Sequence, residues 1–427
     1  MDSQLSPDKG DQGGLQFMRI LYLSLRCPYP PQRGDRIRSY HFIRQLSKRH
    51  EITLVFFAES DDDIAAVKHL KPYCKRIEWV RFRSFFAKVN TAFHFFSRLP
   101  LQVHYWYSQQ MQHKINQLLQ EEDIDLIHAQ LFRMGQYVKN EKRVSKVLDL
   151  CDSLALNLSR RADLDCTPKR FLVRLEEKRV RSYEVEIMKS FDRGTVVAQF
   201  DKDYLLKQDE NLDLSVVPMG VDLKYFHHRS ADGSRSTETD RQSGFHSGLT
   251  SEESINLLFT GTMNYFPNSD AVIYFCEDIL PLIQERYPNT SFQIVGNHPT
   301  NQVKQLERNK GVVVTGYVPD IRPYFEKATI FVAPLRAGSG IQTKNLEAMA
   351  MQTPVVTTSI GAMGLDAERE KEVVIADTPE DFAENVIDLI ENRDRRESIA
   401  RAGRKRVENI YDWNVLVERL EKVYTEI

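Results

Sequence analysis

The sequence has few cysteines, no excess of positive charge and no long apolar run. Its five cysteines are scattered, without a C-x-x-C pair or the spacing of a zinc site, which suits a reducing compartment. Lys and Arg number 58 against 60 Asp and Glu, which argues against a dedicated nucleic-acid-binding protein. Because no apolar run reaches the roughly 18 residues that a spanning segment needs, no transmembrane helix is expected.

Motifs of several other enzyme classes are also missing. No G-x-G-x-x-G follows the first predicted strand, which disfavours an NAD-dependent dehydrogenase. No D-x-D ends a predicted strand and no His/Asp cluster is visible, so no metal and no other cofactor is expected. No carboxylate pair of the glycosidase kind can be recognised. The polar, Gly-rich residues 1–17 do not read as a secretory signal, and we expect a disordered leader there.

What is present is an alternation of short apolar strands and amphipathic helices that runs through the chain twice. The first round opens with MRILYLSL at Met18–Leu25, and the second opens with INLLFTG at Ile255–Gly261. This alternation predicts parallel sheets covered by helices on both faces. The 427 residues exceed one ordinary core, so two domains are expected. The predicted boundaries are 18–215 and 216–405, with a flexible insert near 229–254 and a C-terminal helix, 406–427, packing back on the first domain.

The strongest functional pattern is LRAGSGIQTKNLEAMAMQTPVVTT at Leu335–Thr358, which reads as a strand, a Gly-rich loop and a helix. Gly338 and Gly340 allow the backbone to approach a ligand closely. The N–H groups at the helix start suit a diphosphate, and Lys344 adds a mobile positive charge. Glu347, about one turn later, could accept hydrogen bonds from a ribose diol. The alternative is an ordinary Gly-rich turn with an ion pair in the helix.

A second loop, PPQRGDRIR, follows the first strand of the first domain. Three arginines flank Gly34 and could clamp a phosphate with paired hydrogen bonds. Asp35 could act as general base toward an acceptor, although nothing in the spacing demands it. A solvated basic loop without a ligand is the alternative interpretation, and the sequence does not decide between the two.

The stretch RFRSFFAKVNTAFHFFSRLPLQVHYWY at 81–107 combines phenylalanines at helical spacing with four basic residues. A basic, aromatic amphipathic helix can lie in a membrane interface. The alternative is a helix whose aromatic side chains pack in the core of the first domain. Both interpretations are open at this point, and peripheral membrane contact through 81–107 is our hypothesis.

Several segments in a fixed order carry a resemblance to a known family. They are MRILYLSLRCPYPPQRGDRIRSYHF, DLCDS, EEKRVRSYEVEIMKSFDRGTVVAQ, VVPMGVD, FTGTMNYFPNSDAV, FQIVGNHP, VTGYVPDIRPYF, VAPLRAGSGIQTKNLEAMAMQTPVVTT and YDW. The chain resembles the retaining glycosyltransferase family 4 of the GT-B fold, and most of all the sugar transferases associated with the exosortase (PEP-CTERM) exopolysaccharide system. The resemblance covers nearly all of 18–427 except the insert, and it implies an α/β fold with two Rossmann-like domains facing across a cleft.

The resemblance implies roles for individual residues. It places a nucleotide-sugar donor against Glu347 and against the loop of Gly338, Ser339, Gly340 and Ile341. From the residues themselves we add Gln342, Gly261 and Thr262 as further candidates for donor binding. Glu347 would hold the ribose, and the glycine loop would present N–H groups to the diphosphate. Gly34 would let the first loop approach the donor phosphate or the acceptor. His128, expected at a strand end, would touch the donor sugar, although a satisfied loop histidine is an equal alternative.

The sequence also departs from the family pattern. Many members carry a second Glu eight residues before the glutamate that holds the ribose, and this chain has Ser339 at that position. Many also place an Arg and a Lys after the first strand of the second domain, whereas GTMNYFPN offers Thr262 and Asn268. The charge of the leaving diphosphate must still be stabilised. We therefore assign that role to Lys344 and Arg336, with Asp35, Arg36 and Arg38 on the acceptor or phosphate side.

The expected activity is transfer of a sugar from a nucleoside diphosphate to a hydroxyl of a glycan or polyprenyl-linked oligosaccharide. The resemblance implies retention of anomeric configuration and a role in exopolysaccharide or cell-surface polysaccharide biosynthesis. The expected location is the cytoplasm, at the inner face of the plasma membrane if the membrane contact is real. Two alternatives are kept: a nucleotide-sugar epimerase or hydrolase of the same fold, and an inactive protein that binds nucleotide sugars or glycans.

Overall fold

The computed structural model describes residues 17–164, 169–227, 255–338 and 340–427, which divide into two compact units. The first unit comprises Met1–Val196, Tyr204–Ser215 and Val417–Ile427. The second comprises Val197–Asp203 and Val216–Leu416. The predicted insert near 229–254 and the predicted leader up to residue 16 lie outside the described residues.

The first unit is built on a seven-stranded sheet with the strand order β3-β2-β1-β4-β5-β6-β7. The pairs from β3 to β6 are parallel. The strands are β1 (Arg19–Arg26), β2 (Glu51–Ala58), β3 (Arg76–Arg81), β4 (Leu126–Gln130), β5 (Ser145–Cys151), β6 (Arg193–Val196) and β7 (Leu214–Val216). The central strands are buried on both sides, because crossover helices cover both faces of a parallel sheet.

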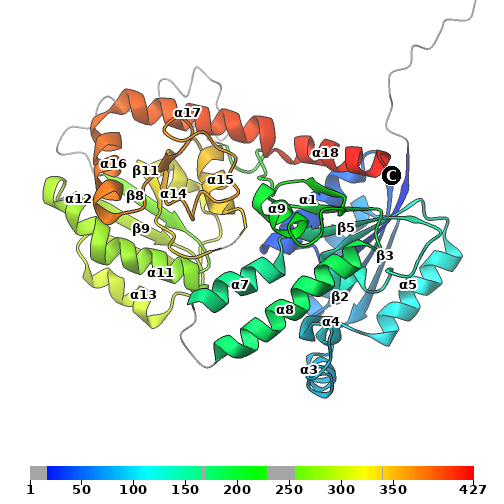
Figure 1. Ribbon diagram of the computed structural model, residues 1–427. Helices are drawn as coiled ribbons and strands as arrows, with labels where there is room; N and C mark the ends of the chain where they lie inside the picture. Colours follow the sequence, from blue (N-terminus) through cyan, green and yellow to red (C-terminus); the bar gives the residue numbers. More distant parts are fainter. Residues whose placement is uncertain (1–16, 165–168, 228–254, 339) are drawn as a thin grey trace, which may run out of the picture. The chain divides into compact units, whose positions relative to one another are not determined.

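Helices alternate with these strands along the chain (Figure 1). They are α1 (Gly34–Leu46), α2 (Asp61–Ala66), α3 (Ser84–Phe93), α4 (Leu101–Tyr105), α5 (Gln109–Glu121), α6 (Leu131–Gly135), α7 (Leu154–Leu164), α8 (Lys169–Met188) and α9 (Gln199–Leu206). Two 3₁₀ turns, Val67–His69 and Lys71–Tyr73, precede β3. Helix α1 connects β1 to its parallel neighbour β2, so the three form a βαβ unit.

The second unit is built on a six-stranded sheet with the order β10-β9-β8-β11-β12-β13, and all its pairs are parallel. The strands are β8 (Asn256–Thr260), β9 (Ser291–Val295), β10 (Val312–Gly316), β11 (Ile330–Ala333), β12 (Val355–Thr357) and β13 (Val374–Ile375). The helices are α11 (Phe266–Tyr274), α12 (Leu280–Arg286), α13 (Asn301–Gln305), α14 (Arg322–Lys327), α15 (Thr343–Ala350), α16 (Pro379–Glu391), α17 (Arg393–Ile410) and α18 (Trp413–Thr425). A π-helical turn, Phe275–Ile279, joins α11 to α12.

The last helix, α18, belongs to both units, since its residues up to Leu416 group with the second and those from Val417 group with the first. In the first unit, Glu421 accepts a hydrogen bond from His50 at 3.1 Å and forms an ion pair with Arg49 at 2.6 Å. Residues from Val417 onward therefore group with the first unit, and both units have the doubly wound α/β architecture predicted from the alternation.

Candidate functional site

The order of strands in the second sheet places its candidate site. From β8 the chain moves outward through β9 and β10, and it then returns to add β11 on the opposite side of β8. Open parallel sheets bind ligands outside the carboxyl ends of their strands, where the strand order reverses in this way. In this sheet that point is occupied by Gly261, which follows β8, and by the loop from β11 to α15.

Two glycines, Gly261 and Gly296, lie at the ends of β8 and β9 in this region. Gly296, directly after β9, has a φ of +155°, and a Cβ atom there would lie 1.7 Å from the carbonyl oxygen of Gly261. A Cβ atom on Gly261 would in turn lie 2.6 Å from the Nδ2 atom of Asn268. The ends of β8 and β9 can therefore meet this closely only because neither residue carries a side chain. The sequence interpretation assigned Gly261 but missed Gly296, whose signal is a glycine at a strand end.

Lys344 is the second residue of α15 and lies in this region, only 8% exposed. Its Nζ atom donates a hydrogen bond to Oδ1 of Asn268 and lies 4.5 Å from the ring centroid of Phe259. Asn268 is itself held by a 3.0 Å bond from Nδ2 to the carbonyl oxygen of Thr262. The expectation of a mobile positive charge is therefore wrong, since the ammonium is fixed by a neutral acceptor and an aromatic ring.

Glu347 follows Lys344 by about one turn of the same helix and is partly buried. Burial raises the pKa of Glu347, and the charge of Lys344 opposes the shift. Burial lowers the pKa of Lys344, and Glu347 opposes that shift. Burial thus disfavours the charged form of both Lys344 and Glu347. Neighbouring ionisable groups with shifted pKa values are typical of functional sites, and a charged ligand would change both pKa values. The ribose contact of Glu347 stays a prediction.

The glycine loop before α15 has the backbone conformation that its sequence predicts. Gly338 and Gly340 have φ angles of +151° and +69°, in the left-handed region that side chains disfavour. Ile341 and Gln342 are partly buried and lead into the first turn of α15. Ser339, which the sequence interpretation also assigned to the donor, lies outside the described residues.

Arg336 lies in the same loop, but its charge is already balanced. Its guanidinium forms paired bonds with Asp270, with Nε at 3.0 Å from Oδ2 and Nη2 at 2.6 Å from Oδ1. The guanidinium also lies 4.3 Å from the ring centroid of Tyr274. The side chain is half exposed, so it remains accessible to a ligand. Of the two predicted cations, Lys344 is the one whose fixed partner is neutral.

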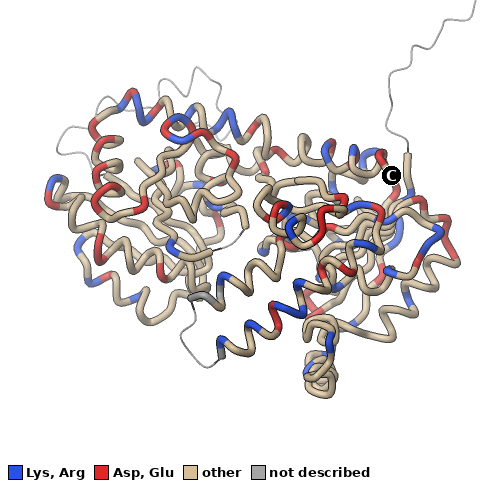
Figure 2. The backbone as a smooth tube through the Cα atoms, viewed as in Figure 1, with Lys and Arg blue, Asp and Glu red and all other residues tan. Residues whose placement is uncertain are grey.

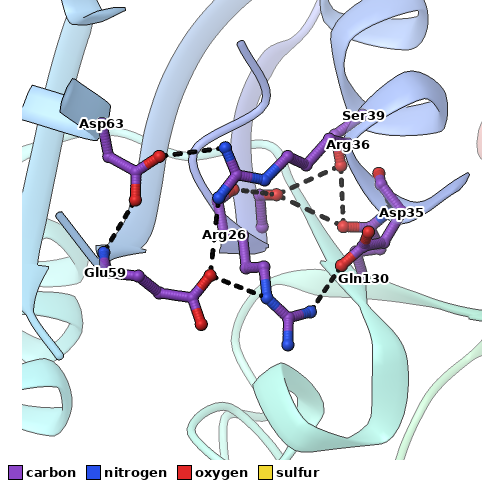
Figure 3. Close-up of polar contacts among 8 residues, drawn as sticks. Arg26, Asp35, Arg36, Ser39, Glu59, Asp63 and Gln130 are labelled. Atoms are coloured by element: carbon purple, nitrogen blue, oxygen red, sulfur yellow. Dashed lines mark hydrogen bonds and ion pairs between the residues drawn. The ribbon is translucent and has the colours of Figure 1, made fainter. Parts of the chain in front are cut away.

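The first sheet reverses its strand order between β1 and β4, and the basic loop after β1 lies at that point. Figure 3 shows Arg26, at the end of β1, and Arg36, in the first turn of α1, in contact with carboxylates. Arg26 contacts Asp35 at 2.6 Å and Glu59 at 3.0 Å. Arg36 contacts Asp63 at 2.9 Å and Glu59 at 3.4 Å. Arg36 is therefore paired and Asp35 is bound to Arg26, whereas Arg33 of the same loop is exposed, as the alternative of a solvated loop would have it.

Two further residues define this edge of the first sheet. Gly34 begins α1, and among the described atoms nothing lies within 4 Å of the position where its Cβ would be. Gln130 ends β4, where Oε1 accepts a 2.7 Å bond from Ser39 and Nε2 donates a 2.8 Å bond to the carbonyl oxygen of Asp35. The sequence interpretation missed Gln130. Its signal is a polar residue that ends a buried strand at the reversal point.

Arg38 does not lie on an accessible surface, which corrects its assignment to the phosphate or acceptor side. It is fully buried, and its guanidinium bonds to Asp149 with Nε at 2.6 Å from Oδ2 and Nη2 at 3.1 Å from Oδ1. It also lies 4.7 Å from the ring of Phe42, one turn further along α1. Burial of a guanidinium is tolerated only with such a partner, so Arg38 has a structural role.

His128 is likewise misplaced by the sequence interpretation, which put it at a strand end. It is a fully buried residue in the middle of β4 that pairs in register with Tyr22 of β1. Its ring stacks on that of Tyr22 at 4.4 Å, and its Nδ1 atom lies 2.8 Å from the hydroxyl of Tyr424. Burial lowers the pKa of His128 to about 4, so the ring is neutral near pH 7. A donor sugar cannot reach it in this arrangement.

No group of three or more His, Cys, Asp or Glu side chains within 17–164, 169–227, 255–338 and 340–427 is arranged to hold a metal ion. In the same part of the chain, no helix combines the length and apolarity needed to cross a membrane.

Comparison with known proteins agrees with this architecture. Residues 254–392 match the family model described as glycosyl transferases group 1. A protein of the cps region of Klebsiella pneumoniae, known as an uncharacterized 44.6 kDa protein, is 21% identical over 409 residues, which cover 90% of this chain and 93% of that protein. The capsular polysaccharide biosynthesis glycosyltransferase CapM of Staphylococcus aureus is 32% identical over 123 residues, which cover 28% of this chain and 32% of CapM.

Among solved structures, Alr3699/HepE of Anabaena in complex with UDP and glucose is similar with a TM-score of 0.62. The match covers 96% of this chain and all of that one, at 14% sequence identity. With two parallel-sheet α/β units and neighbours of this kind, the chain has the GT-B fold. The family model and the match to CapM show that parts of this chain are similar to glycosyltransferases.

Proposed function

We propose that the chain transfers a sugar from a nucleoside diphosphate to a hydroxyl of a glycan or polyprenyl-linked oligosaccharide, with retention of anomeric configuration. The reaction belongs to exopolysaccharide or cell-surface polysaccharide biosynthesis and takes place in the cytoplasm. The observation that carries the proposal is the site at the reversal point of the second sheet. There, Gly261, Gly296 and the loop with Gly338 and Gly340 lie at the strand ends, next to the start of α15, where the ammonium of Lys344 hydrogen-bonds to Asn268.

The site's chemistry suits a diphosphate attached to a nucleoside. Backbone N–H groups at a helix start and a nearby ammonium attract a doubly charged group. Glu347 lies about one turn after Lys344 on the same helix, and its carboxylate would accept hydrogen bonds from the diol of a ribose. The solved relative from Anabaena binds UDP and glucose, which supports a nucleotide sugar as the donor here.

The proposed reaction follows a front-face route. The bond between the anomeric carbon and the diphosphate oxygen breaks, and the departing oxygen takes the proton of the acceptor hydroxyl on the same face. The acceptor oxygen then bonds to the anomeric carbon, so the configuration is retained. The protein contributes positioning and stabilisation of the charge that develops on the diphosphate. We assign the stabilisation of that negative charge to Lys344 and the N–H groups of α15 rather than to a metal ion.

A thermal-shift screen against UDP, GDP, ADP and TDP sugars tests the donor class. A ligand that binds only the folded state raises the melting temperature. At 100 times its Kd, such a ligand adds about 2.7 kcal/mol to the free energy of unfolding. The variant Glu347→Ala should lose the shift of the best donor, while Glu368→Ala, an exposed carboxylate of the same unit, should keep it. A full shift in Glu347→Ala, or no shift with any nucleotide sugar, would overturn the assignment of the site.

Acceptor dependence then separates the proposal from its alternatives. A transferase releases nucleoside diphosphate in proportion to a glycosylated acceptor. An epimerase or hydrolase would give an isomerised or free sugar with the donor alone. Donor binding without turnover on lipid-linked or free glycan acceptors would point to a binding protein.

A further inference from the structure

Helix α3 turns its apolar face outward. Phe85 is 71% exposed, and Phe86 and Val89 are exposed as well. Phe93, at the end of the helix, is 85% exposed. These four side chains fall within an arc of about 100°, because an α-helix turns by about 100° per residue. Ala87, which is buried, lies on the opposite side of that arc. A surface helix normally directs its apolar stripe to the core, and the orientation of α3 is the reverse.

The apolar surface continues past the end of the helix. Phe96 is 93% exposed, and Phe95, which is 37% exposed, packs edge-on against it at 5.3 Å. We call Phe85, Phe86, Val89, Phe93, Phe95 and Phe96 the aromatic face. Monomeric proteins rarely leave contiguous apolar surface of this kind without a binding role. Of the aromatic side chains at the start of the segment, Phe82 does pack inward, stacking on Trp106 at 4.3 Å.

Hydrogen bonds and a ring stack hold the segment that carries the aromatic face. Asn90 donates a 2.6 Å hydrogen bond to the carbonyl oxygen of His104, and the rings of His94 and His104 stack at 4.2 Å. Arg179 of α8 donates a 2.8 Å bond to the carbonyl oxygen of Phe95. The exposure of the phenylalanines is therefore a feature of an ordered segment, which presents them in a fixed arrangement.

The segment that carries the aromatic face has Lys and Arg as its only Lys, Arg, Asp or Glu residues, although Asp61 and Glu176 from other elements contact it at Arg81 and Leu101. Residues 81–107 contain four basic residues and no Asp or Glu. Arg83, Lys88 and Arg98 are exposed, and the guanidinium of Arg83 lies 5.9 Å from the ring of Phe86. Figure 2 shows the tube of α3 in tan and blue without red. Basic side chains beside exposed aromatic rings match a surface that is negatively charged outside and apolar beneath, as an anionic lipid bilayer is.

From this geometry we infer that the aromatic face docks the protein on an anionic membrane surface, with the phenylalanines in the interface and Arg83, Lys88 and Arg98 against lipid phosphates. The inference deepens the proposed function, because it brings a polyprenyl-linked acceptor and the enzyme to the same surface. It does not depend on the donor site, whose residues all belong to the second unit. A second copy of the chain is less suited to the face, because two identical basic surfaces repel each other.

Sedimentation of the full chain with vesicles tests the inference. We expect binding to vesicles of equal parts phosphatidylcholine and phosphatidylglycerol, and weak binding to phosphatidylcholine alone. The combined variant Phe85→Ser, Phe93→Ser and Phe96→Ser should lower the partition coefficient at least tenfold. The control Val313→Ser with Tyr317→Ser, which changes exposed side chains of the second unit, should bind as the unaltered chain does.

Charge reversal provides an independent test. Arg83→Glu with Lys88→Glu should weaken binding to the anionic vesicles by more than tenfold, given about fivefold for each basic residue near the surface. Lys304→Glu with Lys310→Glu changes the net charge equally at exposed positions of the second unit and should leave binding nearly unchanged. Added salt should weaken the binding of the unaltered chain, because it screens the phosphate contacts.

The outcomes separate this inference from the proposed function. Unchanged melting temperatures and donor-induced shifts in the serine variant show that the fold and the donor site are intact, so a loss of vesicle binding then belongs to the aromatic face. Equal vesicle binding by the unaltered chain and the serine variant would overturn the inference. A self-association that the serine variant abolishes, without vesicle binding, would also overturn it and identify the face as a contact between copies.

Discussion

Arg38 and Asp149 form a fully buried ion pair that joins α1 to β5, with Nε of the arginine 2.6 Å from Oδ2 of the aspartate. Thr195 also donates a 2.8 Å bond to Oδ1 of Asp149. Removing one member of such a pair leaves the other charge buried and unpaired. We therefore expect Asp149→Ala to lower the free energy of unfolding by about 3–5 kcal/mol.

A double-mutant cycle in urea unfolding checks this coupling. Arg38→Met with Asp149→Ala should cost less than the sum of the two single changes, because neither charge is then left alone. Removing the exposed pair of Glu368 and Lys371 should change stability little, since both side chains are more than half exposed. Additive effects of the two buried substitutions would show that the pair is not coupled.

Glu184 of α8 predicts a pH dependence of stability in the first unit. Burial raises the pKa of Glu184 to about 8, although Ser153 and the backbone N–H of Leu154 donate bonds of 2.9 Å and 2.8 Å to its carboxyl group. In the unfolded chain the group titrates near its ordinary value of 4.5. The folded state therefore holds a proton that the unfolded state has lost, and its contribution to stability falls as the pH rises from about 5 to about 8.

Glu184→Gln removes this titration and keeps an oxygen that accepts hydrogen bonds. Relative to the unaltered chain, its free energy of unfolding should rise with pH across that window by up to about 1.4 kcal/mol per pH unit. Urea unfolding at several pH values measures the difference between the two proteins. Glu186→Gln, an exposed position on the same helix, is the control. A difference that stays constant with pH would contradict a protonated Glu184.

Much of the fold could be predicted from local sequence, because short apolar runs bounded by turn residues determine where strands lie. INLLFTG and the run at Ile330–Leu335 contain β8 and β11, and the glycine loop between β11 and α15 follows from its composition. The position of Lys344 near the predicted donor site follows in turn, because it stands at the start of that helix.

Side-chain partners that lie far apart in the chain could not be predicted in the same way. Arg38 stands in a loop that reads as basic and exposed, and its partner Asp149 is 111 residues away. Lys344 is held by Asn268, 76 residues away. The direction of the aromatic face of α3 also depends on what packs beneath it, which the periodicity of one helix does not contain.

Replacement by alanine should destabilise the protein at Gly296 but leave its stability unchanged at Gly34. At Gly296 a Cβ atom would lie 1.7 Å from the carbonyl oxygen of Gly261, so the backbone must move. We expect Gly296→Ala to lower the free energy of unfolding by more than about 2 kcal/mol. At Gly34 no described atom lies within 4 Å of a Cβ, so Gly34→Ala should keep the melting temperature.

The kinetic constants of Gly34→Ala test whether Gly34 belongs to the proposed site. If the loop at the start of α1 approaches a donor phosphate or an acceptor, the added methyl group should raise KM or lower kcat severalfold in a folded protein. Steady-state kinetics with varied donor and varied acceptor show which of the two is affected. Unaltered kinetic constants for both substrates would remove Gly34 from the proposed site.

Lys344 and Arg336 are both cations of the loop and helix at the donor site, but they should differ in their effect on turnover. The ammonium of Lys344 is bound to the neutral Asn268, so its charge is available to a departing diphosphate. The guanidinium of Arg336 is already paired with Asp270. Lys344→Met should therefore lower kcat by about 100-fold or more, the cost of losing a donor to developing negative charge. Arg336→Met should have a smaller effect.

The surroundings of Lys344 also predict that arginine will not replace it. The side chain is enclosed between Phe259 and Asn268 and is buried, so the larger planar guanidinium of Lys344→Arg does not fit the same space. Lys371→Met, an exposed position in the same unit, controls for a simple loss of positive charge. Measuring kcat and the melting temperature together separates chemistry from folding. Near-normal kcat in a folded Lys344→Met variant would show that the diphosphate charge is stabilised elsewhere.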